Sequence, residues 1–161
     1  MTNVNDLSLL AYLRQDSRAH LMDISRKSRI PVSTLHDRLM EKAGSSILRY
    51  TCLADFCAIG FAVQAHVLFK INKSDKDNVH KFLMKSLNVN NLYKINNGYD
   101  FIAEFVFRSI SEMEGFFDSL DQKFSIKSKE VHYIISDLKR EAFLSSPDFI
   151  PALFPESKEP Q

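Results

Sequence analysis

Residues 21–42 read LMDISRKSRIPVSTLHDRLMEK, and this stretch decides the organisation of the N-terminal part of the chain. Leu21, Ile24 and Ser25 follow helical spacing. Pro31 must end this helix, because its ring and its missing N–H cannot continue one, although a proline is tolerated in the first turn of the next. We therefore predict two short helices joined by a turn of three or four residues.

The second of these helices has one apolar face and one polar face. Val32, Leu35 and Leu39 recur at i, i+3 and i+7, which is the spacing of a buried helical stripe. The other side chains that could reach base edges in a major groove are Ser33, Thr34, His36 and Asp37. The cations suited to phosphate are Arg29, Arg38 and Lys42. A solvated surface is the alternative for each of them, since Asp37 and Glu41 oppose the approach of phosphate.

The segments on either side complete a small domain. Leu7, Leu10, Ala11 and Leu13 predict a preceding helix, capped by Asn5 or Asp6. On the other side, Gly44 ends the third helix, and 47–53 is rich in strand-forming residues, which predicts a wing-like extended arm. Three helices and a wing are typical of a winged helix-turn-helix.

Charge and cysteines limit the function further. Residues 1–60 carry eight basic and six acidic side chains, against thirteen and fourteen in the remainder, so nucleic-acid binding belongs to the first half. Cys52 and Cys57 have no second ligand pair nearby for a tetrahedral metal site, and we expect two buried, reduced thiols. With no secretory leader and no apolar run of about 20 residues, we expect a cytoplasmic protein without a membrane span.

The second half alternates between strand and helix patterns. Extended segments are predicted at 61–71, 89–96, 99–107 and 131–135, and helices at 75–86 and 111–120, the latter behind a capping box of Ser111 and Glu114. The order βαββαβ is that of a ferredoxin-like α+β domain, with helices on one sheet face only. We expect a second copy of the chain to cover the other face, in a homodimer.

The last residues are expected to form a proline-containing tail. A helix is predicted at 138–144, and four prolines then prevent continuous regular structure. The tail nevertheless carries Phe149, Ile150, Leu153 and Phe154, which predicts that it docks on a surface. The expected domains are residues 1–60, a DNA-binding domain with its linking strand, residues 61–140, a dimerisation and effector-sensing domain, and residues 141–161, the tail.

The order of the motifs resembles the Lrp/AsnC family, the leucine-responsive or feast/famine regulators, over about residues 5–140. The matching motifs are Arg14-Gln15-Asp16-Ser17-Arg18, Asp23-Ile24-Ser25, Ser33-Thr34-Leu35-His36-Asp37-Arg38-Leu39, Gly44…Ile47-x-x-Tyr50…Gly60 and Asn97-Gly98-Tyr99-Asp100-Phe101. The resemblance implies a winged helix-turn-helix for double-stranded DNA and a ferredoxin-like domain whose sheets pair face to face, in dimers that assemble into tetramers or octamers. It also implies an amino acid or related metabolite bound near a hairpin, here formed by Asn97, Gly98, Tyr99 and Asp100.

Four positions depart from the family pattern. Arg29 stands where the turn usually has glycine, and Pro31 replaces the usual serine cap. In the hairpin Asn97 takes the place of the first glycine, so Gly98 is displaced by one position, and Val131 replaces a common threonine. An alternative for the hairpin is therefore a type I′ turn, in which Asn-Gly supplies positive φ and Asp100 only caps neighbouring amides.

We therefore expect a sequence-specific DNA-binding transcription regulator of the Lrp/AsnC type, modulated by an amino acid or related small molecule. The alternatives are an architectural DNA-binding protein without an effector, and a ferredoxin-like enzyme. Against an enzyme, there is no glycine-rich phosphate loop and no nucleophile beside a base, and the histidines are scattered at His20, His36, His66, His80 and His132. We expect no cofactor and no metal.

Overall fold

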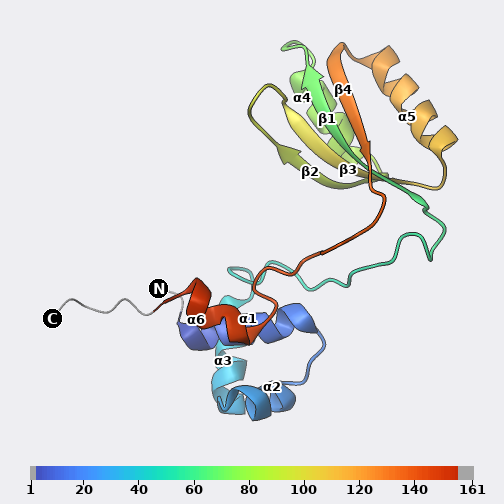
Figure 1. Ribbon diagram of the computed structural model, residues 1–161. Helices are drawn as coiled ribbons and strands as arrows, with labels where there is room; N and C mark the ends of the chain where they lie inside the picture. Colours follow the sequence, from blue (N-terminus) through green and yellow to red (C-terminus); the bar gives the residue numbers. More distant parts are fainter. Residues whose placement is uncertain (1–2, 156–161) are drawn as a thin grey trace. The chain divides into compact units, whose positions relative to one another are not determined.

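The computed structural model describes residues 3–155, which form two compact units (Figure 1). One unit contains the described residues up to Leu53 together with those from Leu138 onward, and the other is Ala54–Asp137. The tail thus returns to the unit that contains the N-terminal helices.

The N-terminal unit is built on three helices, α1 (Val4–Gln15), α2 (Leu21–Ser28) and α3 (Val32–Lys42). Their shared core contains Leu9, Leu13, Ile24, Ile30 and Leu35. The predicted cap of α1 at Asn5 or Asp6 was wrong: Asn3 is the N-cap, and Asp6 accepts a hydrogen bond from the Asn3 N–H in a capping box. The apolar residues that predicted this helix begin at Leu7, whereas α1 begins about one turn earlier, at Val4.

The arm predicted at 47–53 forms no strand in the described chain. The segment makes one isolated β-bridge, between Ala43 and Ile47. It forms no strand because no neighbouring strand within residues 3–155 accepts and donates the hydrogen bonds of its N–H and C=O groups. Leu48, Tyr50 and Leu53 are exposed. The prediction of buried thiols was also wrong: Cys52 is in this unpaired arm and Cys57 just beyond it, and both are free and exposed.

The tail docks on α1. Leu144 and Ile150 are buried with Leu7 and Ala11 in a small cluster of their own. Arg14 fastens the contact from α1: its Nε donates to the Phe143 carbonyl at 2.7 Å, and its guanidinium pairs with the Glu141 carboxylate at 2.8 Å.

The regular structure of the tail differs from the prediction. No helix forms at 138–144, and the tail instead contains a 3-10 turn, η1 (Pro147–Phe149), and the short helix α6 (Ile150–Leu153), each with proline in its first turn. The segment from Leu138 to Leu144 buries only Leu144, so it gains too little from packing on one face to form a helix.

The C-terminal unit has the predicted βαββαβ order. Its elements are β1 (Val63–Ile71), α4 (Lys76–Lys85), β2 (Val89–Lys94), β3 (Phe101–Phe107), α5 (Ile110–Lys123) and β4 (Ile126–Tyr133). The strands form one antiparallel sheet in the order β2-β3-β1-β4. Both helices cover the same face of the sheet (Figure 1).

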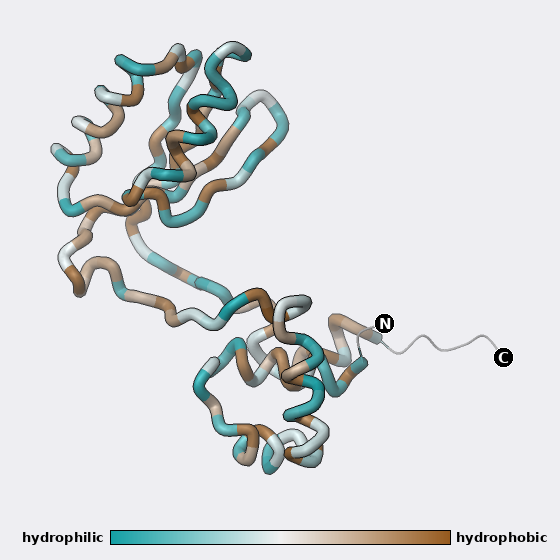
Figure 2. Tube along the Cα trace, turned by 180° about the vertical axis from the view of Figure 1, so that it is seen from behind, coloured by the Kyte–Doolittle hydropathy of each residue, from teal (hydrophilic) through white to brown (hydrophobic). Residues whose placement is uncertain are grey.

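The core of this unit lies between the sheet and its two helices. It is dominated by phenylalanines, of which Phe69, Phe105, Phe107 and Phe117 are almost fully buried. The Phe105 and Phe117 rings meet edge to face, with centroids 5.4 Å apart. Along β1, buried positions alternate with less buried ones, as expected for a sheet with one packed face, and Figure 2 shows hydrophilic residues interspersed among the hydrophobic ones in this unit.

The cap of α5 and the start of β4 differ from the prediction. The cap of α5 is Ser109, whose hydroxyl accepts from the Glu112 N–H, whereas the prediction chose the overlapping Ser-x-x-Glu pattern two residues later. Strand β4 begins at Ile126, not near Val131. Its first half, IKSKE, is polar because β4 is an edge strand, which weakens the apolar alternation that identifies a strand.

Candidate DNA-binding and sensing sites

The turn between α2 and α3 accommodates both departures in this region. Arg29 adopts the left-handed conformation, with φ 60° and ψ 23°, and its N–H donates to the Ser25 carbonyl at 2.8 Å. Pro31 is the N-cap of α3 and makes no side-chain capping bond. Its carbonyl accepts from the Leu35 N–H at 3.0 Å, so the helix starts normally with one side-chain acceptor fewer.

The outer face of α3 brings several predicted DNA-contacting residues together. Ser33, His36 and Asp37 are exposed, and Thr34 is half-buried. His36 Nδ1 lies 3.5 Å from Asp37 Oδ1, with both side chains mainly in solvent, so this contact constrains neither of them strongly. Met40, 64% exposed, extends the same face by one turn. It was absent from the predicted set, although its i+7 spacing from Ser33 was visible in the sequence.

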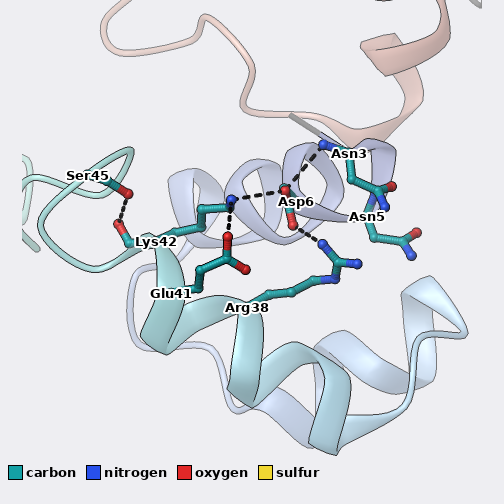
Figure 3. A network of polar contacts seen from close by, with 7 residues as sticks. All are labelled: Asn3, Asn5, Asp6, Arg38, Glu41, Lys42 and Ser45. Carbon is teal, nitrogen blue, oxygen red and sulfur yellow. Dashed lines mark hydrogen bonds and ion pairs between the residues drawn. The ribbon is translucent and has the colours of Figure 1, made fainter. Parts of the chain in front are cut away.

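Arg38 and Lys42 turn away from this outer face, toward α1 (Figure 3). Arg38 Nη1 donates to Asp6 Oδ1, and Lys42 Nζ lies 3.3 Å from Asp6 Oδ2 and 3.0 Å from Glu41 Oε1. Asp6 is 6% exposed and is the one buried charged residue in the described part of the chain. The two cations therefore already have a carboxylate partner, and their role at phosphate stays a prediction.

The charge states in this network follow from its contacts. Burial by itself would raise the pKa of Asp6, but hydrogen bonds from Arg38, the Asn3 N–H and Lys42 together lower it below its ordinary value. Hydrogen bonds to Glu41 and then Asp6 raise the pKa of Lys42. Asp6 and Lys42 are thus ionised at neutral pH, and the network fixes α3 against α1.

Basic side chains at the end of α2 were not in the predicted set. Arg26 and Lys27 are exposed there, beside Arg29 in the turn. Arg26 Nη1 lies 3.5 Å from Asp23 Oδ1, an exposed pair of little strength. The sequence pattern that could have identified them is the basic run Arg26-Lys27-Ser28-Arg29, which ends about one helical turn before Ser33, the first predicted base-reading residue.

The hairpin between β2 and β3 is a tight turn with positive φ at two residues. Asn97 has φ 61° and Gly98 has φ 99°. The Asp100 carboxylate accepts from the Ile71 N–H at 2.8 Å and pairs with Lys76, and these contacts, Lys76 first, lower its pKa. Tyr99 donates its hydroxyl hydrogen to Glu130, which raises the tyrosine pKa. The Tyr99 hydroxyl and the Asp100 carboxylate thus contact the chain's own residues.

A small cavity lies beside the hairpin. It has a volume of about 200 Å³ and lies between α4 and the sheet, lined by Lys76, Asp77, His80, Met84, Leu92, Lys94 and Phe101. Val131, the fourth departure, pairs with Val67 and packs against the phenylalanine core. The hydroxyl of a threonine there would enter the packed side of the sheet.

Within residues 3–155, no group of three or more His, Cys, Asp or Glu side chains is arranged to hold a metal ion. Among the same residues, no helix has the length and apolar character that a membrane crossing requires.

Comparisons with known proteins agree with this architecture. The HTH-type transcriptional regulator FL11 of Pyrococcus abyssi is 25% identical over 114 residues, which cover 70% of this chain and 76% of FL11. LrpC of B. subtilis superposes with a TM-score of 0.76 at 18% identity, covering 86% of this chain and 97% of LrpC. The regulator NMB0573 of Neisseria meningitidis, in complex with L-Met, gives a TM-score of 0.80 at 15% identity, covering 87% and 94%. No family model matches the chain.

Proposed function

We propose that this chain is a transcription regulator of the Lrp/AsnC family rather than an enzyme, and that it recognises a specific double-stranded DNA sequence as a dimer, with α3 in the major groove. The observation that carries the proposal is the outer face of α3, where exposed polar side chains stand on a helix fixed from behind by Asp6. A rigid recognition helix with accessible hydrogen-bonding groups is what base readout requires.

Within this proposal Asp37 and Ser33 read base edges. Asp37 accepts from a cytosine amino group, and Ser33 is at the N-terminal end of α3, which enters the groove first. His36 and Thr34 flank them, and Met40 supplies apolar contact to a thymine methyl. Arg29 makes the main phosphate contact, and Arg26 and Lys27 at the end of α2 make further ones.

Arg38 and Lys42 contribute to DNA binding less directly than the other basic residues of this set. Phosphate contact by either one competes with its pairing to Asp6, so we assign them first to holding α3 in place. Their substitution should weaken binding to all sequences alike, since the whole helix is displaced. A base-reading residue should instead relax the preference at one base pair and cost about 1–3 kcal/mol.

The dimer follows from the sheet. Both helices of the C-terminal unit cover one face, and a second copy stacked on the other would place two recognition helices for two half-sites. Selection of bound fragments from a random DNA library tests both parts. A pseudo-palindromic consensus supports the proposal, whereas binding without any enriched sequence would identify an architectural DNA-binding protein.

An amino-acid effector at the hairpin is a second, finer proposal, favoured by the L-Met complex of NMB0573. Here an incoming α-ammonium group would have to displace Lys76 from Asp100. Titration calorimetry with the twenty amino acids at millimolar concentration tests it. Binding that Asp100→Ala abolishes, in a variant that circular dichroism shows to be folded, supports the pocket. No binding, or binding unchanged by the substitution, leaves the hairpin as a turn.

A further inference from the structure

The open face, by which we mean the sheet face of the C-terminal unit opposite α4 and α5, carries a polar row across all four strands. In the register of the sheet, Asn91 of β2 lies opposite Glu104 of β3. Glu104 lies opposite His66 of β1, and His66 lies opposite His132 of β4. On β1 the neighbours of His66 are Ala65 and Val67, which are fully buried on the helix side. Since side chains alternate along a strand, His66 and its row lie on the open face.

The centre of this row is an acid beside a histidine. In the order β2-β3-β1-β4, the two inner strands are β3 and β1, so Glu104 and His66 stand in the middle of the face. Glu104 is half-buried and its Oε2 accepts from Asn91 Nδ2, while His66 is exposed.

The other titratable groups of the open face are further from its middle. His132 and Glu130 are on β4, with His132 Nε2 3.7 Å from Glu130 Oε2. Glu130 also accepts from the hydroxyl of Tyr99, in the hairpin between β2 and β3. Lys70 lies toward the end of β1, and Tyr93 is on the edge strand β2. The carboxylate nearest to His66 by register is therefore Glu104.

Stacking two such faces about a two-fold axis, as the proposed dimer requires, brings the middle pair of each copy toward the middle pair of the other. Two Glu104 carboxylates then lose water in the same small region, and burying charge without compensation is costly. Histidine is the side chain that changes charge between pH 5 and 8. A proton on His66 supplies the missing positive charge without any other ligand.

We propose that dimer formation takes up protons at His66, so that the Glu104–His66 pair makes assembly of the regulator sensitive to pH. This inference rests on the proposed face-to-face dimer. A dimer that binds more protons than two separate monomers is favoured by lower pH, by up to about tenfold in its dissociation constant per linked proton and pH unit. The dimer should therefore be tighter at pH 6 than at pH 8.

The test is the dimer dissociation constant of the full chain at pH 6 and pH 8, from analytical ultracentrifugation with a fluorescent label down to nanomolar concentration. The wild type should dissociate at least about tenfold more readily at pH 8. Glu104→Gln keeps an acceptor for Asn91 but removes the charge, so it should dimerise at pH 8 as tightly as the wild type does at pH 6. His66→Gln should be as weak at pH 6 as the wild type at pH 8.

His20→Gln is the matched control, because His20 is an exposed histidine of the N-terminal unit, and it should keep the wild-type pH dependence. Circular dichroism melts establish that each variant is folded. Equal dissociation constants at both pH values would overturn this inference and leave the proposed dimer standing. A dimer that is tighter at pH 8 and dissociates in EDTA would also overturn this inference, because a divalent cation would then lie between the two faces. A monomer at every concentration and pH would overturn the dimer itself.

Discussion

Asp6 in the N-terminal unit and Asp100 in the C-terminal unit are two carboxylates with the same physical task. Asp6 accepts a hydrogen bond from the Asn3 N–H, and Asp100 accepts one from the Ile71 N–H. Each carboxylate also pairs with a cation from another element. Asp6 is 6% exposed and has two cationic partners, whereas the side chain of Asp100 is 18% exposed and has Lys76. In both units a carboxylate that is largely removed from solvent thus holds two elements together.

The largest expected effect is that of Asp6→Ala. It leaves Arg38 and Lys42 facing each other behind α3 without their carboxylate, which should cost about 3 kcal/mol of unfolding free energy. Urea denaturation measures this. Asp37→Ala, at a side chain 83% exposed, is the matched control and should stay within about 0.5 kcal/mol of the wild type. Equal losses in the two variants would contradict the anchoring role of Asp6.

Asp100→Ala should have a smaller effect on the same measurement. It removes one ion pair and one amide acceptor in a more exposed place, for a loss of about 1.5 kcal/mol. Lys76→Met should lose part of this, and the double variant should show coupling between the two positions. Additive losses would mean that the pair seen in the structure contributes nothing to stability.

Both carboxylates predict the same sign of pH dependence. The lowered folded-state pKa of Asp6 and of Asp100 means that each contributes stability that is complete above the unfolded value and is lost as pH falls through the folded one. Wild-type stability should therefore decrease from about pH 4 downward. In Asp6→Ala and Asp100→Ala this acid decrease should be shallower, and a slope as steep as the wild type's would assign it to other groups.

The smallest expected effect is that of Arg29→Gly. Glycine relieves the left-handed strain at this turn but adds freedom to the unfolded chain, so the net gain should be about 0.5 kcal/mol. DNA affinity should nevertheless fall, and its salt dependence should decrease by about one unit of slope, if Arg29 contacts phosphate. Arg18→Gly, at an exposed position outside the turn, serves as the control. Unchanged salt dependence would remove Arg29 from the phosphate contacts.

Much of the architecture could be predicted because it depends on local pattern. Pro31 separates α2 from α3, and the alternation on either side of Phe69 and Phe105 identifies the inner strands. The prediction failed where local pattern is weak. The first half of β4 is polar because it lies at an edge, and the arm at 47–53 has strand-forming residues but no partner. Strand propensity alone does not satisfy a backbone.

Periodicity alone predicted the three N-terminal helices, the βαββαβ order of the C-terminal unit and the outer face of α3, since it reports which side chains are buried. The contacts between these elements follow from the tertiary structure instead. Arg38 meets Asp6 across 32 residues of sequence, and Arg14 meets the tail across 127. Such pairings depend on where helices cross and strands lie in register, which no local pattern encodes. The same is true of the open face, where Glu104 and His66 become neighbours only because β3 pairs with β1.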